Sequence, residues 1–174
     1  MIELILLGAL AALAWRFFSK GTAFVPGFAT LLEQPVIARR GFRSYLSGVE
    51  QVGGDYLGRP VVLVLHHKRG DDLGYLIVGM EAMGTSVPDA ENSGVLRDWI
   101  HDPDALNALD DLELRYKLKL SLEDAWLKAT WMPIGFFIFP GRFDKDRWHH
   151  VLRAMHRVAR SLEESASRMP RGGS

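Results

Sequence analysis

The sequence contains no cysteine among its 174 residues. This absence excludes disulfide bonds, thiolate zinc sites, cysteine-ligated iron–sulfur clusters and a cysteine nucleophile from this chain. It does not decide between a reducing and an oxidising compartment. The cytoplasm is slightly favoured, because thiols serve no structural purpose in a reducing environment.

An excess of charge of either sign is also missing, since 21 lysines and arginines balance 21 aspartates and glutamates. A global basic excess would attract nucleic acid, so we expect no nucleic-acid partner. The composition, with 48% hydrophobic and 24% charged residues, is typical of a globular domain with a short appendage.

Recognised catalytic motifs are missing as well. The sequence has no GxxxxGK[ST], no GxGxxG after a strand pattern, no GxSxG and no HExxH. These absences lower the weight of an enzymatic function without excluding one. We expect no catalytic residue, no cofactor and no metal site.

Residues 1–20, MIELILLGALAALAWRFFSK, form a strongly apolar stretch with no charge between Glu3 and Arg16. A helix over it would be about 25 Å long, slightly short of a ~30 Å hydrocarbon core. The stretch predicts an uncleaved, single-pass transmembrane anchor helix. The residues expected to hold it in the membrane are Leu4, Leu7, Leu10, Leu13, Trp15, Phe17 and Phe18.

Two other interpretations of this stretch exist. A cleaved signal is disfavoured, because Glu3 precedes the apolar core and bulky residues follow it. A buried or partner-docked helix stays open, because apolar runs of about 10–14 residues are often core helices. The flanking basic residues, from Arg16 to Arg43, lie on the C-terminal side and predict a cytoplasmic domain.

The predicted fold class is α+β. We expect an antiparallel sheet of about five strands in two groups, with a C-terminal amphipathic helix packed on one face. The predicted divisions are an anchor helix at 1–20, a membrane-proximal connector at 21–54, the globular domain at 55–166 and a flexible tail at 167–174. Within the connector, apolar spacing predicts a short helix around Phe28–Gln34.

The first predicted strand group is a hairpin formed by Val61–Leu65 and Tyr75–Met83. A short surface helix should follow, with Asp102 as its N-cap and Pro103 in its first position. The second group is expected to contain three strands. They are the strictly alternating segment Leu112–Ser121, the segment Ala125–Trp131 after a turn at Glu123 and Asp124, and the segment Ile134–Pro140.

The last element should be a helix capped by Asp144 and ending near Glu164. Its apolar stripe consists of Trp148, Val151, Leu152, Met155, Ala159 and Leu162. On another face stand His149, Arg153, His156 and Arg160. We expect a solvated basic face, with an anion, lipid-headgroup or acidic-partner surface as the alternative.

The candidate anion or partner surface consists of six arginines: Arg39, Arg40, Arg43, Arg153, Arg157 and Arg160. Weaker candidates for a ligand or enzyme site are His66 or His67, His101 and Glu81. Adjacent residues of a strand point to opposite faces, so His66 and His67 cannot bind one ion together.

The expected function is non-catalytic. The pattern indicates a membrane-anchored accessory or scaffold subunit that binds a larger membrane protein complex or its assembly factors. A membrane-tethered enzyme or small-ligand binder is the first alternative, and a peripheral binder of anionic lipids is the second.

Overall fold

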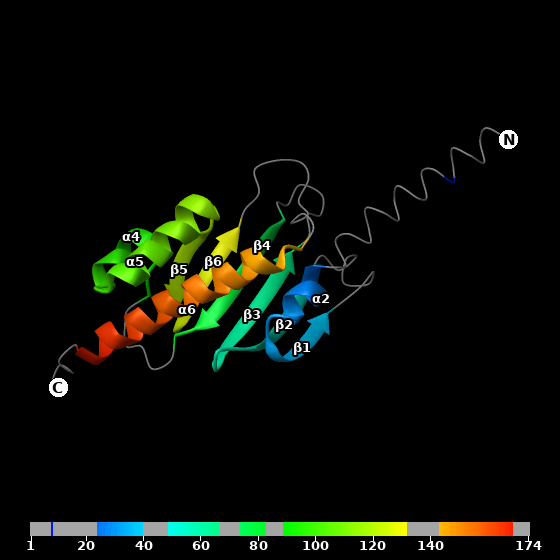
Figure 1. The fold of residues 1–174 in the computed structure, drawn as a ribbon, viewed down its shortest axis with the longest axis horizontal. Coiled ribbons are helices and arrows are strands. Elements are labelled where there is room, and N and C mark those ends of the chain that lie inside the picture. Colours follow the sequence, from blue (N-terminus) through cyan, green and yellow to red (C-terminus); the bar gives the residue numbers. More distant parts are fainter. Residues whose placement is uncertain are drawn as a thin grey trace.

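The computed structural model describes Gly8 and residues 24–39, 49–66, 74–82, 89–131 and 143–168. These residues form an α+β domain built on one antiparallel sheet of six strands (Figure 1). The strands are β1 (Glu33–Arg39), β2 (Val49–Tyr56), β3 (Arg59–His66), β4 (Tyr75–Glu81), β5 (Lys119–Glu123) and β6 (Trp126–Trp131). The helices are α2 (Phe24–Ala29), α4 (Ser93–Trp99), α5 (Pro103–Asp110), the π-helix η1 (Asp111–Arg115) and α6 (Lys145–Arg168).

The strand order in the sheet is β1-β2-β3-β4-β6-β5. The expected hairpin of β3 and β4 is confirmed by its register, in which His66 lies opposite Tyr75. Strand β6 pairs with β4 on one side and with β5 on the other. The two expected strand groups therefore merge into one sheet, because β6 inserts beside β4.

The alternating burial of strand β3 shows that one face of the sheet is buried. Its residues alternate between buried and half-exposed, with Val61, Leu63 and Leu65 buried and Val62 and Val64 half-exposed. Since successive side chains of a strand point to opposite faces, the buried set marks the face that the helices cover. Figure 1 shows α6 crossing that face, with α2 beside it.

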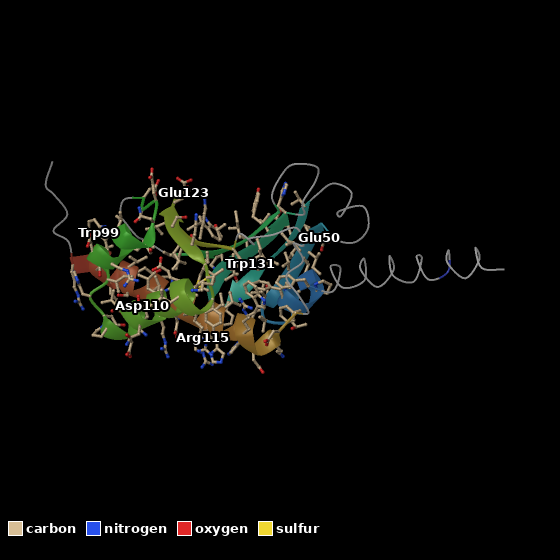
Figure 2. All side chains as sticks on the ribbon, turned by 90° about the horizontal axis from the view of Figure 1, so that it is seen from above. Glu50, Trp99, Asp110, Arg115, Glu123 and Trp131 are labelled. Carbon is tan, nitrogen blue, oxygen red and sulfur yellow. The ribbon has the colours of Figure 1, made fainter. Side chains whose placement is uncertain are left out.

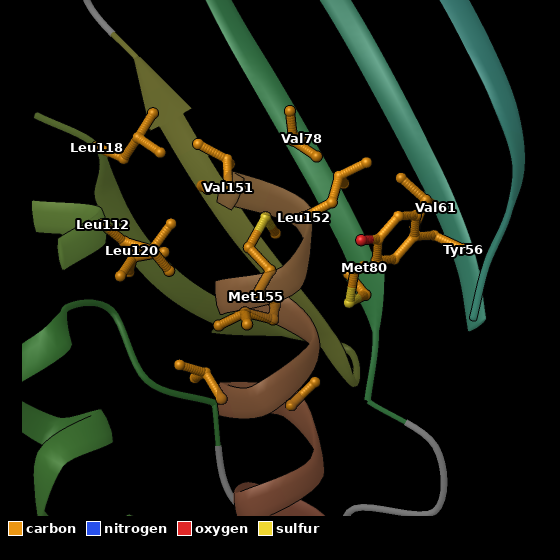
Figure 3. Close-up of a cluster of buried hydrophobic side chains, with 14 of the residues drawn as sticks. Tyr56, Val61, Val78, Met80, Leu112, Leu118, Leu120, Val151, Leu152 and Met155 are labelled. Atoms are coloured by element: carbon orange, nitrogen blue, oxygen red, sulfur yellow. The ribbon is translucent and has the colours of Figure 1, made fainter. Parts of the chain in front are cut away.

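Helix α6 confirms the predicted C-terminal helix. The Asp144 carboxylate accepts a hydrogen bond from the Arg147 backbone N–H at 3.1 Å, as an N-cap does. Every residue of the predicted apolar stripe is buried. In Figure 3, Leu152 and Met155 lie between Met80 of the sheet and the leucines of η1 and β5. The helix runs to Arg168, so it extends into the region predicted to be a tail.

The structure differs from the expectation for residues 21–54. Helix α2, strand β1 and most of strand β2 lie in this range, and the expected domain start at residue 55 falls inside β2. Phe24 and Phe28 of α2 pack edge-on against Trp148 of α6, with ring centroids 5.4 and 5.8 Å apart. Among the described residues of this range, the glycines and prolines lie within these short elements: Pro26 and Gly27 in α2, Pro35 in β1, and Gly53 and Gly54 in β2.

A second difference concerns the alternating segment Leu112–Ser121. Its first part is η1, which continues α5, and the strand begins only at Lys119. Residues four apart share a face in both a helix and a strand, so buried Leu112 and Tyr116 fit either structure. Leu114 is 67% exposed, which fits the helix alone. Lys117, with φ of 58°, ends the helical stretch.

The turn between β5 and β6 lies one residue later than predicted, at Asp124 and Ala125. Both have positive φ, 51° and 63°, as a two-residue type I′ turn requires. The predicted strand Ile134–Pro140 lies outside the described residues. The predicted N-cap is confirmed, since Asp102 accepts a hydrogen bond from the Asp104 backbone N–H at 3.1 Å.

Within the described parts of the chain, no helix has both the length and the apolar character needed to cross a membrane. Residues 1–20 lie outside those parts, apart from Gly8. The anchor helix and its seven expected membrane-facing residues therefore stay predictions.

Candidate functional site

A groove of about 360 Å³ runs between α6 and the helical stretch formed by α5 and η1. The two stretches are antiparallel. Arg115 at the end of η1 and Arg147 at the start of α6 both lie over the Tyr116 ring, whereas Asp102 before α5 shares a second hollow with Ser161 of α6. We call the first hollow the interhelical groove. Its lining residues are Asp104, Asn107, Ala108, Asp111, Arg115, Tyr116, His150, Arg153, Ala154 and Arg157.

The helical period explains why these residues share a groove. From each stretch they recur three or four positions apart, so they form one face of it. Ala108 and Ala154 occupy central positions on the two facing surfaces. Because protein interiors are otherwise closely packed, two methyl groups at a helix contact leave room that larger side chains would fill. The hollow thus follows from small residues at matched positions.

The groove is rich in arginine. Arg115, Arg153 and Arg157 line it, and in the described part of the chain no carboxylate forms a salt bridge with any of them. Arg153 and Arg157 also stand one helical turn apart, where like charges destabilise a helix. Other arginines have acidic partners: Arg59 pairs with Glu163, Arg97 with Asp110 and Glu113, and Arg160 with Glu164.

Two arginine side chains lie over the Tyr116 ring at one end of the groove. The guanidinium of Arg115 lies 5.4 Å from the centre of the ring, and that of Arg147 lies 5.7 Å from it. Both are cation–π distances. Figure 2 shows Arg115 on the helical side of the molecule, beside the first turns of α6. Two carboxylates, Asp104 and Asp111, also line the groove.

Arg153 is oriented by a polar chain that reaches the sheet. One of its Nη atoms lies 3.0 Å from His149 Nε2, and His149 Nδ1 lies 3.4 Å from the Tyr56 hydroxyl. A guanidinium can only donate, so His149 Nε2 is the acceptor in this contact. Burial raises the pKa of Tyr56, and the neighbouring Arg153 charge partly opposes this rise.

A second polar cluster lies further along α6. Arg59 of β3, 9% exposed, donates two hydrogen bonds to the Glu163 carboxylate, one of them 2.6 Å long, and a third to the Glu81 carbonyl oxygen at 3.3 Å. The Glu163 hydrogen bonds raise the pKa of Arg59. Burial lowers the pKa of His156, and the charges of Arg59 and Arg160 lower it further. This cluster ties the sheet to α6.

One end of the sheet gathers the attachment points of several segments outside the described residues. In the register, His66 lies opposite both Val49 and Tyr75, and Trp131 lies opposite Leu76. Arg39 lies near the same end, opposite Gln51. We call this the Trp131 end. Segments 40–48, 67–73 and 132–142 all join the strands there.

The segment before α2 joins the fold at the same end. Phe24, the first residue of α2, lies with its ring centroid 5.5 Å from that of Phe143. It also packs on Trp148, which lines a hollow together with Trp131. The start of α6 therefore lies at the Trp131 end too, and so does the attachment point of residues 1–23.

Taken together, the sequences attached at the Trp131 end contain basic and large apolar residues, although 67–73 also contains Asp71 and Asp72. The segment 40–48 reads RGFRSYLSG, 67–73 reads HKRGDDL and 132–142 reads MPIGFFIFPGR. Residues 1–23 are the fourth segment that joins this end, and they contain the predicted anchor with Trp15, Phe17 and Phe18. At the other end, the β2–β3 turn at Leu57 and Gly58 and the β5–β6 turn at Asp124 and Ala125 are short, and segment 83–88 follows β4 there.

The six predicted surface arginines do not form one patch among the described residues. Arg153 and Arg157 line the interhelical groove, whereas Arg160 pairs with Glu164 at 2.9 Å. Arg39 ends the edge strand β1, while η1 packs against the opposite edge strand, β5. Arg40 and Arg43 lie outside the described residues.

The weaker candidates for an enzyme or ligand site lie apart. His66 and Glu81 stand at opposite ends of the paired strands β3 and β4, separated by about 20 Å of strand. His66 stacks on Tyr75 at 4.8 Å, and His101 borders the hollow near Ser161. His67 lies outside the described residues. Among those described, no group of three or more histidines, aspartates and glutamates could hold a metal ion.

Sequence reasoning missed Arg115, Tyr116 and His150 as groove residues. It placed Arg115 on the wet face of a strand, and the structure places it on a helix. The helical spacing of Asp104, Ala108 and Asp111 continues to Arg115 and is the signal that could have identified this face.

Comparison with protein-family models, with curated proteins and with solved structures found no match. The fold and the groove thus define the class on their own: an α+β domain whose helices cover one face of an antiparallel sheet and enclose an arginine-rich groove.

Proposed function

We propose that this chain is a membrane-anchored accessory subunit, whose α+β domain binds a larger membrane protein complex or its assembly factors without catalysing a reaction. The observation that carries the proposal is the common attachment end. Residues 1–23 and the segments 40–48, 67–73 and 132–142 all join the fold at the Trp131 end. A domain tethered through residues 1–20 would present this end to the bilayer.

The chemistry of the attached segments supports this orientation. Lysines and arginines next to a membrane are attracted to anionic headgroups, and aromatic side chains favour the membrane interface. The basic residues Arg40, Arg43 and Lys68 come from two of these segments, and the phenylalanines of FFIF come from the third. The positive flank of residues 1–20 favours a cytoplasmic domain.

Absence of cysteine makes the orientation directly testable. Lys145→Cys places a probe on an exposed position at the Trp131 end, and Leu57→Cys places one on a 58% exposed position at the other end. Strand β2 alone separates the two ends by about 25 Å. Each full-length variant carries one fluorophore and is studied in native membranes and in vesicles that contain spin-labelled lipid.

We expect quenching by the spin-labelled lipid at position 145 and little quenching at position 57. Equal quenching at the two positions, or complete release of the chain from membranes by alkaline carbonate, would contradict the tethered orientation.

The accessory role needs a separate measurement. Gently solubilised membranes are analysed by native electrophoresis, with the full chain compared with a variant lacking residues 1–20. We expect the full chain to migrate in a larger complex and to crosslink reproducibly to one membrane protein. Migration of the full chain alone, with no reproducible crosslink in cells, would refute the accessory role.

A further inference from the structure

We propose that the interhelical groove binds the phosphate group of a small ester whose organic part carries hydroxyl groups. The proposal rests on the groove alone and does not depend on the membrane tether. Its first support is the convergence of Arg115 from η1 with Arg153 and Arg157 from α6. None of these three forms a salt bridge within the described residues, whereas Arg59, Arg97 and Arg160 do.

Arginine suits phosphate for geometric reasons. Its guanidinium stays charged at any physiological pH and offers a planar fork of donors that matches phosphate oxygens. A phosphate monoester carries a charge of about −1.5 to −2 near neutral pH, which suits more than one arginine. Arg153 and Arg157 repel each other along α6, and a dianion bound beside Arg153 would offset part of that repulsion.

The position of the charges fixes the direction of the ligand. Arg115 stands at the end of the groove where Arg147 also lies over Tyr116, so positive charge is greatest there. Asp104, in the first turn of α5, lies towards the other end, and Asp111 lies between them. The phosphate would bind at the Tyr116 end. Hydroxyl groups further along the ligand would donate hydrogen bonds to the two carboxylates.

The size of the groove agrees with such a ligand. Its volume of about 360 Å³ lies near the lower limit of small-molecule sites, which is roughly 300 Å³. Ala108 and Ala154 line this volume, and a larger side chain at either position would occupy part of it without removing a charge. Substituting either alanine therefore tests the effect of the groove's shape on binding while its charges stay the same.

The test uses the full chain in a non-ionic detergent, with inorganic phosphate and glycerol 3-phosphate as probes and calorimetry as the readout. We expect both probes to bind, and glycerol 3-phosphate to bind more tightly because its hydroxyls reach the carboxylates. Arg153→Gln and Arg115→Gln should each weaken binding about tenfold, the effect of one lost charged hydrogen bond. Ala154→Leu should abolish binding, and Arg160→Gln, a change outside the groove, should leave it unchanged.

A further arm distinguishes a soluble ester from a lipid headgroup of the same chemistry. Glycerol 3-phosphate is titrated in the presence of phosphatidylcholine vesicles, with and without phosphatidylglycerol. Weakening that depends on phosphatidylglycerol and disappears in Ala154→Leu assigns the groove to the lipid headgroup, whereas unchanged binding assigns it to a soluble ester.

Failure to bind either probe at millimolar concentration would overturn the proposal. So would binding that survives Ala154→Leu and both glutamine variants. Because binding of a phosphate probe in detergent does not depend on how the chain is tethered, a negative result here leaves the orientation experiment unaffected, and the reverse also holds.

Discussion

Arg59 at the start of β3 and Glu163 on α6 form a bidentate ion pair across 104 residues of sequence. The side chains are 11% and 20% exposed, so the pair is largely removed from water. The pair joins the sheet to α6 (Figure 1). Among the described helices, only α6 crosses the covered face of the sheet from the Trp131 end towards the β2–β3 turn.

Glu163→Gln should lower the free energy of unfolding by about 2 kcal/mol, because it leaves the Arg59 guanidinium poorly compensated at a site with little water. Chemical denaturation of the full chain measures this change. The matched control is Glu164→Gln, which removes the exposed Arg160 pair on the same helix and should cost less than about 0.5 kcal/mol. Equal effects of the two substitutions would show that the Arg59 pair contributes no more than a surface pair.

Gly54→Ala should destabilise the domain by about 1–3 kcal/mol through overpacking. A Cβ atom at Gly54 would lie 2.8 Å from the Glu33 carbonyl oxygen and 3.2 Å from the Pro35 Cα, both backbone atoms that cannot move aside cheaply. The neighbouring Gly53→Ala is the control. Its Cβ would meet only the Val61 carbonyl oxygen at 3.6 Å, an ordinary contact. Thermal unfolding of both variants tests whether β1 is an integral part of the sheet.

Ala125→Gly should stabilise the domain by about 0.5 kcal/mol. Ala125 has φ of 63° in the β5–β6 turn, where glycine is free of the steric penalty that a Cβ brings. The greater entropy of glycine in the unfolded chain offsets part of this gain. Asp124→Gly should gain less, because aspartate tolerates this conformation better than alanine. A loss of stability in Ala125→Gly, measured by urea denaturation, would contradict the turn type.

His156 should make stability fall at mildly acidic pH. Its pKa is lowered from 6.5 in the folded chain by burial and by the charges of Arg59 and Arg160, so the folded state binds fewer protons than the unfolded state. The contribution is present above pH 6.5 and is lost as the pH falls towards the folded-state pKa. The decrease in melting temperature from about pH 7.5 to about pH 5.5 should be smaller in His156→Gln than in the parent chain. Identical decreases would show that His156 titrates alike in both states.

Much of the fold was predictable where one local pattern had a single structural interpretation. The apolar stripe of α6, the Asp102 N-cap and the β3–β4 hairpin each follow from residues close together in sequence. The segment from Leu112 was not predictable in this way, because residues four apart share a face in a strand and in a helix. The two structures differ in the burial of Leu114, which a strand would bury and the helix exposes. The sequence shows only that this residue is a leucine, which by itself suggests burial.

The groove was harder to predict from the sequence than the fold. Arg153 and Arg157 could be assigned to one helical face from their spacing. Their meeting with Arg115 depends on the antiparallel packing of η1 against α6, which joins residues about 40 positions apart in the sequence. The alanines that open the groove carry no signal of their own, since alanine is common in helices.

The sequence by itself determined which segments carry an apolar face, where the main helix begins and where several of the strands run, because these depend on side-chain period and capping. It also determined the absence of cysteine chemistry. Only the tertiary structure decided that β6 lies beside β4, that residues 33–39 and 49–54 belong to the sheet and that three arginines share one groove. Each of these depends on contacts between distant residues, and such contacts are chosen by how complete faces pack together.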